Sequence, residues 1–495
     1  MPENPNILFI ITDHQAYHGH DRPGEFEFKW PRFEQFCEGG TRFNRAYSVC
    51  PICSPARSSM MSGIYPSRHG LRWNTGGRRD SLSDFRQGQM LYSHYLSREG
   101  YRNAYVGKWH CGQERLPIDY GMEGWSLPDY GKIYMSDAYR ERGNALGFGD
   151  ATVRMEHNLN HPEWDGQDIV LHAQSPWTFM NGSGVLKGPP EAHEEQFVAH
   201  LAVEKLRELS QNSQPWSLVA SFWGPHQAYY PTEPFAGMVD PSSIPEYPTF
   251  RDDLEGRPIR HRMHRDFHHT GAKEWKDWST WQEILARCYE QAYQCDAAIG
   301  SILDELEAQG QTENTMVIWL ADHGDAVASH GGMWDKASTY TEEVARVPLA
   351  VRWPARFKGG MATDHLVSNM DATATILAAA GVQVPEHMDS RSILPVCEMG
   401  DSADWSDQLI CEHNGHGEEI LQRIVLHDRF KYVAALYDGD EMYDLSEDPY
   451  EVRNLVDSPD HRSEKEDLRR RVIDHIEQTN DDHASRLAYS LRQGF

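Results

Sequence analysis

The sequence predicts an α/β fold, in which a large, mixed but mostly parallel sheet lies between layers of helices and precedes a smaller antiparallel sheet and a helix. Short apolar runs alternate with longer amphipathic segments through most of the 495 residues, which is typical of parallel strands joined by helices. After about residue 385 the runs are shorter and turn residues such as Asp438-Gly439-Asp440 separate them. That second pattern is typical of antiparallel hairpins.

Five strands are expected in the large sheet, because each is a short apolar run bounded by polar or turn residues. They cover residues 7–12, 103–106, 217–222, 316–321 and 347–352. A helix is expected over 297–308, where four aliphatic residues recur at helical spacing before Gly310. The segments 112–195 and 251–281 lack such periodicity, so we expect long irregular loops there.

These changes in pattern divide the chain into three parts. We expect a large α/β domain over residues 1–385, a small subdomain over 386–480 and a polar tail over 481–495. The small subdomain should end in a charged helix over about 462–478. This helix and the tail leave two alternatives open, a contact in a homo-oligomer or a solvated cover on the core.

Bulk properties exclude some classes of partner. The formal net charge of -28 argues against binding to nucleic acids or acidic membranes, so an anionic substrate would need a local basic pocket. The early apolar run 7–11 is too short for a signal peptide, and no stretch is long enough to span a membrane. The eight cysteines lack the spacing of a disulfide framework, so we expect reduced thiols and a cytoplasmic location.

The most informative local motif is Cys-Ser-Pro-Ala-Arg at residues 53–57. Proline is tolerated in the first turn of a helix, and Gly63 is suited to end that helix. Cys53 would then stand at the helix N-terminus, where free N–H groups and the helix dipole favour negative charge. Arg57 follows one turn later.

Two simpler explanations compete for Cys53. An isolated cysteine of this kind can be a packed small hydrophobe. With Cys50 it also forms a Cys-x-x-Cys pair, which can be a redox dithiol or half of a zinc site. A zinc site needs a second ligand pair, and Cys111 has no close partner in the sequence. A thioredoxin-like site expects a small domain around the motif, which this chain does not offer.

Polar pairs follow two of the expected strands. Asp13 and His14 follow the first strand, and Asp322 and His323 follow the strand 316–321. Ligands bind outside the carboxyl ends of the strands in open α/β sheets, so we expect both pairs at one edge beside Cys53. Two carboxylates and up to two imidazoles are enough for one divalent cation.

Further candidates for chemistry also follow strands or short motifs. Taken singly, each is better explained as a surface charge or as a satisfied core residue. They are Asn74, Lys108 and His110 in Gly-Lys-Trp-His, His226 in Trp-Gly-Pro-His, and Lys336 in Trp-Asp-Lys.

Together these motifs resemble those of the formylglycine-dependent type I sulfatases, a family of the alkaline-phosphatase superfamily. The family's Cys-x-Pro-x-Arg, Gly-Lys-x-His and Pro-His motifs and its downstream lysine occur here in the family's order. The resemblance continues through residues 367–371 and 442–445 and covers nearly the whole chain. It implies that residues 1–385 form the catalytic domain of a sulfuric ester hydrolase.

The resemblance also implies the parts of the site. Cys53 would be oxidised by a maturation enzyme to formylglycine (3-oxoalanine), the nucleophile. The implied ligands of one divalent metal ion are Asp13, Asp322, His323 and the formylglycine oxygen, with His14 either a further ligand or a residue behind the ligands. Many sulfatases have a second aspartate where this chain has His14, which leaves calcium, manganese and magnesium open. The implied catalytic residues are Cys53, Arg57, Asn74, Lys108, His110, His226 and Lys336.

The implied reaction is the hydrolysis of sulfate monoesters to an alcohol and inorganic sulfate. A hydroxyl of the hydrated aldehyde attacks sulfur and the alcohol departs, helped by His226 and Lys336. His110 then deprotonates the second hydroxyl, and sulfate leaves as the aldehyde reforms. The nearest alternative is a phosphonate monoester or phosphodiester hydrolase, which His14 favours and the Lys108–His110 pair disfavours. A non-catalytic binding protein would show degraded motifs, and these are intact.

The alcohol part of the substrate is not specified by any motif. We expect it to be recognised by the aromatic loop with Trp125, Tyr130 and Trp164 and by a histidine-rich loop. That second loop contains His261, His264, His268 and His269. It could bind a metal ion, but a solvated loop is the better explanation of its composition. A cytoplasmic location favours a small ester, such as an aryl, alkyl or sugar sulfate, over an extracellular polysaccharide.

Overall fold

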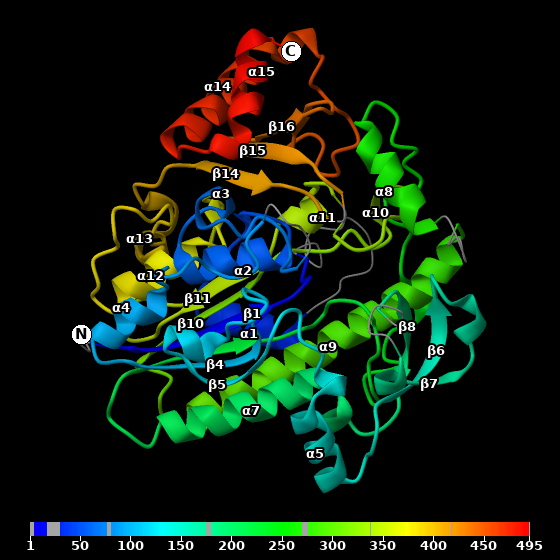
Figure 1. Ribbon diagram of the computed structural model, residues 1–495, viewed down its shortest axis with the longest axis vertical. Helices are drawn as coiled ribbons and strands as arrows, with labels where there is room; N and C mark the ends of the chain where they lie inside the picture. The colour runs from blue at the N-terminus through cyan, green and yellow to red at the C-terminus, as the bar shows by residue number, and fades with distance from the viewer. Residues whose placement is uncertain are drawn as a thin grey trace.

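An eight-stranded mixed sheet forms the centre of the computed structural model, which describes residues 4–16, 30–76, 81–174, 180–269, 276–336, 338–416 and 418–494 (Figure 1). The strand order is β12-β2-β11-β10-β1-β9-β4-β5. The five strands from β10 to β5 run parallel, whereas β11 is antiparallel to both of its neighbours. The strands are β1 (Asn6–Thr12), β2 (Thr41–Phe43), β4 (Arg102–Lys108), β5 (Glu123–Leu127), β9 (Trp216–Ser221), β10 (Thr315–Ala321), β11 (Leu349–Arg352) and β12 (Met361–Thr363).

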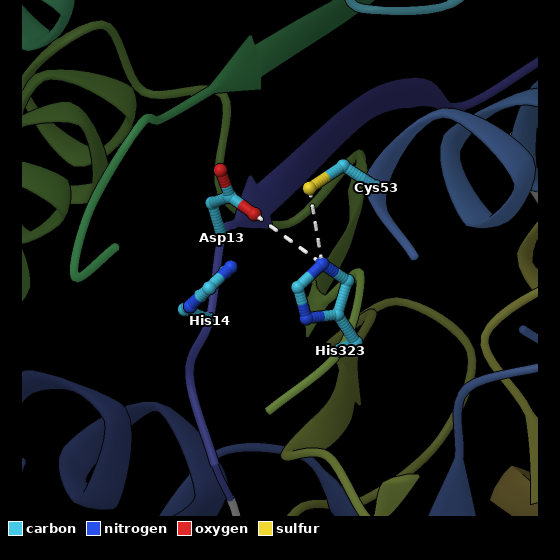
Figure 2. Close-up of side chains that lie close together, drawn as sticks. All are labelled: Asp13, His14, Cys53 and His323. Carbon is cyan, nitrogen blue, oxygen red and sulfur yellow. Dashed lines mark hydrogen bonds and ion pairs between the residues drawn. The ribbon is translucent and has the colours of Figure 1, made fainter. Parts of the chain in front are cut away.

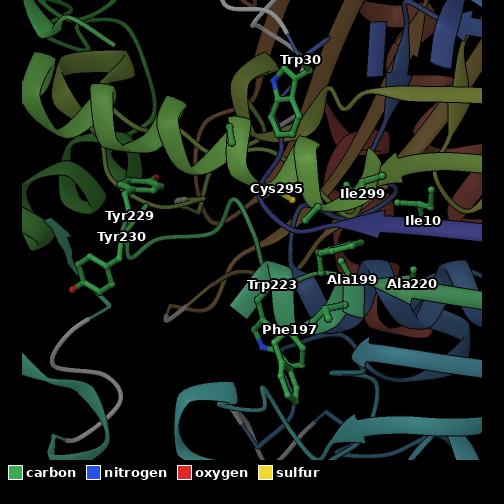
Figure 3. Close-up of a cluster of buried hydrophobic side chains, with 14 of the residues drawn as sticks. Ile10, Trp30, Phe197, Ala199, Ala220, Trp223, Tyr229, Tyr230, Cys295 and Ile299 are labelled. Carbon is green, nitrogen blue, oxygen red and sulfur yellow. The ribbon is translucent and has the colours of Figure 1, made fainter. Parts of the chain in front are cut away.

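Helices cover both faces of this sheet because successive residues of its central strands point to opposite sides. Leu8 and Ile10 of β1 pack in one buried cluster with α1 (Pro31–Glu38), α7 (Glu194–Leu209) and α9 (Trp278–Ala308). Figure 3 draws part of that cluster, including Ala220 of β9 and Ile299 of α9. Ile7, Phe9 and Ile11, which alternate with them along β1, pack in a second cluster on the other face. This cluster includes α2 (Cys53–Ser62), α4 (Tyr92–Arg98), α12 (Asp371–Ala379) and α13 (Leu394–Met399). The predicted fold class is confirmed.

Helix α9 is much longer than the predicted helix over 297–308. Its first half carries buried polar residues, which break the apolar periodicity that sequence analysis depends on. These side chains hold the segment that follows β9. Gln291 accepts a hydrogen bond from the Tyr230 amide at 2.7 Å and donates one to the His226 carbonyl at 2.9 Å. The polar face of α9 therefore fixes the backbone on which His226 lies.

The segment 112–195, expected to be irregular, contains a helix and a small sheet. Helix α5 covers Asp137–Leu146, and the antiparallel strands β6 (Thr152–Asn158), β7 (Asp168–Val170) and β8 (Gly182–Leu186) form a three-stranded sheet. The segment 251–281 likewise contains α8 (Ile259–His269). Glycines and polar residues within these short elements conceal their periodicity in the sequence.

Two histidines of the loop expected to be solvated are buried in α8. His261 pairs with Glu441 at 3.0 Å, and His264 Nε2 lies 3.2 Å from the Trp334 carbonyl oxygen. The side chains of His268 and His269 lie outside the described part of the chain. The solvated-loop expectation is therefore wrong for the first two histidines, because α8 is packed between the large domain and the small sheet.

The small sheet lies at one end of the molecule, at the top of Figure 1. Its four antiparallel strands are β14 (Gln408–His413), β15 (Leu421–His427), β16 (Phe430–Leu436) and β17 (Glu441–Asp444). Helix α14 (Arg462–Gln478), which was predicted from the sequence, packs on it. The expected polar tail differs, because it contains helix α15 (Ser485–Gln493), whose Leu487 and Leu491 are buried.

The small sheet and the large domain are in close contact. Apolar side chains of both form one buried cluster, which includes Tyr340 and Ile424. Lys431 of β16 is buried and pairs with Glu342 at 3.0 Å and with Glu451. The boundaries near residues 385 and 480 stay a prediction. In the described parts of the chain, no helix is both long enough and apolar enough to cross a membrane.

A buried histidine caps α7 and predicts sensitivity to acid. His193 Nδ1 accepts a hydrogen bond from the Glu195 amide at 3.2 Å. Burial lowers the pKa of His193 from 6.5 to about 3. The folded protein therefore keeps this imidazole neutral while the unfolded chain takes up a proton, and stability is lost as the pH falls from about 6.5 toward 3. At pH 5 we expect this one group to cost about 2 kcal/mol relative to pH 7.

The measurement is urea unfolding at pH 7 and pH 5 for the wild type and for His193→Asn. Asparagine can also cap a helix, and its side chain does not titrate between pH 5 and pH 7. The variant should therefore lose less stability than the wild type between the two pH values. Equal losses in both proteins would show that His193 is not the group responsible.

Candidate active site

The carboxyl ends of three parallel strands carry candidate site residues at one edge of the large sheet, where ligands bind in folds of this class. Asp13 and His14 follow β1, Lys108 ends β4, and Asp322 and His323 follow β10. Cys53 faces this edge from the first residue of α2. Potential ligand atoms of Asp13, His14, Cys53 and His323 all lie within 4.8 Å of one another (Figure 2).

Helix α2 holds Cys53 in a fully buried position. The helix begins at Cys53 and ends at Ser62, and Gly63 follows with a left-handed φ of 71°, as expected of a glycine at this position. Asn74 Oδ1 accepts a hydrogen bond from the Ser54 amide at 3.1 Å, so this predicted site residue fixes the first turn. Burial raises the pKa of the Cys53 thiol to about 12. The unmodified side chain is therefore a protonated thiol at neutral pH.

Cys50 lies in a different environment from Cys53. It belongs to a small buried cluster with Val49, Ile52 and Met370. Both cysteines are free thiols, and burial raises the pKa of Cys50 as well. The Cys-x-x-Cys spacing therefore places one thiol in the core and one in the site.

His323 presents an unprotonated ring nitrogen to Cys53 and Asp13. Its Nδ1 lies 2.9 Å from the Gly324 carbonyl oxygen and must donate there, since that oxygen can only accept. Burial lowers the pKa of His323, so the ring is neutral and Nε2 keeps its lone pair. Nε2 lies 3.1 Å from Cys53 Sγ and 3.8 Å from Asp13 Oδ1. A histidine fixed in this way is the usual form of a metal ligand.

Asp13 supplies a second potential metal-ligand atom. Its Oδ2 pairs with the Lys108 ammonium, whereas its buried Oδ1 has no hydrogen-bond partner among the described residues. Lys108 and the other nearby cations hold the pKa of Asp13 well below its usual range, against the opposing effect of burial. An orphaned carboxylate oxygen opposite an imidazole lone pair fits a divalent cation, so Asp13 and His323 fit the metal site that the resemblance implies.

Arg57 donates hydrogen bonds from all three of its side-chain nitrogens to protein groups. Its Nε donates to Asp322 Oδ2 at 2.7 Å, and its Nη1 donates to the Lys108 carbonyl at 3.0 Å and to Ser221 Oγ at 2.7 Å. The side chain is buried, as is Asp322. Arg57 thus joins α2 to the ends of β4, β9 and β10. The sequence placed this residue in the site but did not show which groups it contacts.

An aromatic ring connects the predicted proton-transfer residues. The Lys108 ammonium lies 4.2 Å from the centroid of the Tyr130 ring, and the rings of His110 and His226 lie 5.4 Å and 5.5 Å from it. Burial lowers the pKa of His226 to about 3 and also lowers that of His110. His110 Nδ1 is buried and has no hydrogen-bond partner among the described residues. Both rings are neutral, so either can accept a proton.

His14 and Lys336 lie on the other side of the site. His14 Nε2 is 2.9 Å from Lys336 Nζ, and its Nδ1 is 3.2 Å from Asp325 Oδ2. Asp335 Oδ1 accepts from Lys336 Nζ at 3.0 Å. The sequence analysis missed Asp325 and Asp335, although Asp325 closes the same Asp-His-Gly-Asp run as the predicted ligands.

Tyr130 also lines a small pocket beside the site. The pocket wall includes Trp223, Glu194, Gln227 and Tyr230. The two other aromatic residues expected to contact the alcohol are placed differently. Trp125 packs edge-on against Phe197 at 5.1 Å, and Trp164 stacks on His161 at 4.4 Å. Of the three, Tyr130 alone is in contact with the predicted site residues.

Comparisons with known proteins agree with this architecture. The family model described as "Sulfatase" matches residues 5–382, and the model described as "N-sulphoglucosamine sulphohydrolase, C-terminal" matches residues 329–478. Among curated relatives, an uncharacterized sulfatase of Escherichia coli strain K12, YidJ, is 27% identical, and the alignment covers 99% of this chain and 90% of that protein. The choline-sulfatase of Rhizobium meliloti is 26% identical over 92% of this chain and 83% of that protein.

Solved structures share the fold. The putative sulfatase yidJ from Bacteroides fragilis superposes with a TM-score of 0.72 at 19% identity, covering 99% of this chain and 98% of that one. The phosphonate monoester hydrolase from Silicibacter pomeroyi superposes with a TM-score of 0.75 at 20% identity, covering 97% of each chain.

Proposed function

Because the chain belongs to the sulfatase family of sulfuric ester hydrolases, we propose that it hydrolyses sulfate monoesters through a formylglycine made from Cys53. The observation that carries the proposal is the position of Cys53. Its side chain starts a buried helix and faces an orphaned carboxylate oxygen of Asp13 and the lone pair of His323. A nucleophile and a cation site therefore share one sheet edge.

The unmodified thiol is poorly suited to attack an ester. A thiol with a pKa of about 12 carries almost no thiolate at neutral pH. Conversion to an aldehyde by a maturation enzyme, which supplies the oxidant, removes this difficulty. Hydration of the aldehyde then provides two hydroxyl groups on one carbon.

Asp13, Asp322 and His323, with the oxygen of modified residue 53, would hold the divalent metal ion. When bound, the ion would supply positive charge next to the nucleophilic oxygen and the sulfuryl group. An imidazole in the ligand set suits manganese or another transition ion better than calcium, which prefers an all-oxygen shell. Arg57 would act on this site by holding Asp322, the carboxylate that accepts from its Nε.

The remaining residues would carry charge and protons. One hydroxyl of the hydrate loses its proton to solvent and attacks sulfur as the bond from sulfur to the alcohol oxygen breaks, with the Lys108 and Lys336 ammonium groups next to the developing charge. Lys336 would protonate the leaving oxygen, whereas the neutral His226 ring, whose pKa burial lowers to about 3, is no acid at neutral pH. His110 then accepts the proton of the second hydroxyl, the carbonyl bond reforms, and the bond from carbon to the sulfate oxygen breaks.

A phosphonate monoester or phosphodiester hydrolase is the second candidate. The structures of this fold include the phosphonate monoester hydrolase reported above. Many sulfatases have a second aspartate after the first strand, and this chain has His14 in its place. The Lys108–His110 pair favours sulfate esters.

The pocket beside Tyr130 would receive the alcohol, so an aryl, alkyl or sugar sulfate remains the expected substrate class. A cytoplasmic location and a homo-oligomer also remain proposals.

The test is turnover of p-nitrophenyl sulfate and of p-nitrophenyl phenylphosphonate by protein co-expressed with a formylglycine-generating enzyme. We expect kcat/KM for the sulfate to exceed that for the phosphonate by about tenfold or more, which corresponds to about 1.4 kcal/mol of transition-state stabilisation. A preference for the phosphonate would favour the second candidate. Absence of turnover on both esters, with residue 53 shown to be converted, would contradict both.

A further inference from the structure

Both ring nitrogens of His14 are engaged by protein groups. Nδ1 lies 3.2 Å from Asp325 Oδ2, and Nε2 lies 2.9 Å from Lys336 Nζ. Figure 2 shows His14 next to Asp13, Cys53 and His323, but it draws no interaction between His14 and these three residues. His14 therefore lies near the cation site while its hydrogen bonds lead away from it.

The partners determine which nitrogen carries the proton. The Lys336 ammonium has only donors, so His14 Nε2 must be the acceptor, and a neutral imidazole then has its one N–H at Nδ1. Asp325 accepts that hydrogen bond. Its carboxylate also accepts from Tyr229 Oη at 2.7 Å and from the Val327 amide at 3.1 Å. In this tautomer His14 has no lone pair left for a metal ion.

The backbone of His14 supports a dedicated role. Its φ of 59° lies in the left-handed region, which is uncommon for residues other than glycine. Strained conformations of this kind persist where the surrounding contacts fix them, and they are concentrated at functional sites. Because of this turn, the side chains of His14 and Asp13 point in different directions although both residues follow the same strand.

Lys336 is held from two sides. It donates to His14 Nε2 and to Asp335 Oδ1, and it is almost completely buried. An ammonium group has three donors, so one N–H has no partner among the residues that the structure describes. The ring of His226 packs on His14 at a tilt, with 3.7 Å between the ring centroids and 42° between the ring planes. His14 thus contacts both Lys336 and His226, the two residues expected to act on the departing alcohol.

We propose that His14 is a positioning residue and not a metal ligand: with Asp335 it holds the Lys336 ammonium toward the leaving oxygen, and Asp325 fixes the tautomer that this requires. The inference rests on the proposed sulfate-ester hydrolysis. In the step it describes, an N–H bond of Lys336 breaks as the O–H bond of the departing alcohol forms. The neutral amine then regains a proton from water before the next turnover.

The experiment compares His14→Ala and His14→Gln with the wild type on two esters, p-nitrophenyl sulfate and an alkyl sulfate. The aryl ester has a good leaving group and gains little from protonation. We expect H14A to lower kcat for the alkyl ester by about 10²-fold more than for the aryl ester, the usual size of a general-acid effect. H14Q should stay within a few-fold of the wild type, because its side-chain oxygen can accept from Lys336.

Metal content gives a readout that does not depend on turnover. We expect H14A and H14Q to bind the same amount of metal as the wild type by plasma mass spectrometry, whereas His323→Ala should lose it. Loss of metal from H14A would make His14 a ligand and overturn the inference. An equal loss of kcat on both esters would also overturn it, since a general structural defect predicts that result. If the wild type hydrolysed neither ester, the proposed function would fail, and the metal content of H14A would still decide whether His14 is a ligand.

Discussion

Replacing Cys53 by alanine is expected to lower kcat for any sulfate ester by about 10⁴- to 10⁶-fold, the size of loss that follows removal of a covalent nucleophile. Cys53 lies at the start of α2 against His323 and is 1% exposed, so alanine removes few contacts and should leave the fold intact. Steady-state kinetics on p-nitrophenyl sulfate, with circular dichroism as a check of folding, makes the measurement.

The matched control is Cys50→Ser. Cys50 is also buried, but it packs among apolar residues away from the cation site. We expect near-normal activity from this variant and no activity from C53A. The peptide that contains residue 53 should also be lighter by about 18 Da than the unmodified sequence, the difference between a thiol and an aldehyde side chain. Loss of activity in C50S with an unmodified thiol at residue 53 would instead support a redox dithiol.

Arg57→Ala should damage both stability and activity. Arg57 is the buried cation next to Asp322, at 2.7 Å, and its removal leaves an uncompensated buried carboxylate. Breaking such a pair typically costs about 3–5 kcal/mol. Because Asp322 would no longer be held at the sheet edge, kcat should also fall by about 10²- to 10³-fold. Urea unfolding at pH 7 and steady-state kinetics measure the two effects.

A second substitution separates charge from packing. Asp322→Asn in the Arg57→Ala background removes the unpaired charge, so it should recover part of the lost stability while activity stays low. Arg57→Lys should lie between the wild type and R57A, since lysine keeps the charge but lacks the fork that reaches Ser221 and the Lys108 carbonyl. An unfolding free energy of R57A equal to that of the wild type would show that the ion pair contributes nothing.

The large sheet was predictable because its central strands are buried on both faces. Such strands are continuous apolar runs, and β1, β9 and β10 all lie within one residue of their predicted bounds. Some candidate site residues were also predictable, because Asp13, Lys108 and Asp322 lie at the ends of strands or directly after them. Helix α2 was located from its proline and from Gly63, whose backbone has the left-handed conformation that the sequence indicated.

Elements that bury polar side chains were not predictable. The part of α9 before residue 297 binds the segment after β9 through Glu290, Gln291 and Gln294, which are polar and so give no apolar periodicity in the sequence. Helix α15 was missed for a related reason, because only a few of its residues are apolar and they are buried against the small sheet. Tertiary contacts decide both cases.

The same limit applies within the site. Sequence motifs named the residues that converge, but not the partners that fix their protonation. Asp325 and Tyr229 come from different strand ends, and only the fold brings them to His14. The engagement of Arg57 by Asp322 likewise depends on the packing of α2 against β10, which no local pattern encodes.

The position of β1 in the middle of the sheet delays the completion of the site during protein synthesis. Its partner β10 ends at Ala321, about 270 residues after Cys53, and ribosomes add about 5–20 residues per second. Roughly 15 to 50 seconds therefore pass before the residues that enclose Cys53 leave the ribosome. A modifying enzyme that needs access to the thiol has at least this interval, and synonymous codons that change the speed of translation between residues 53 and 321 should change the fraction of molecules that carry the aldehyde.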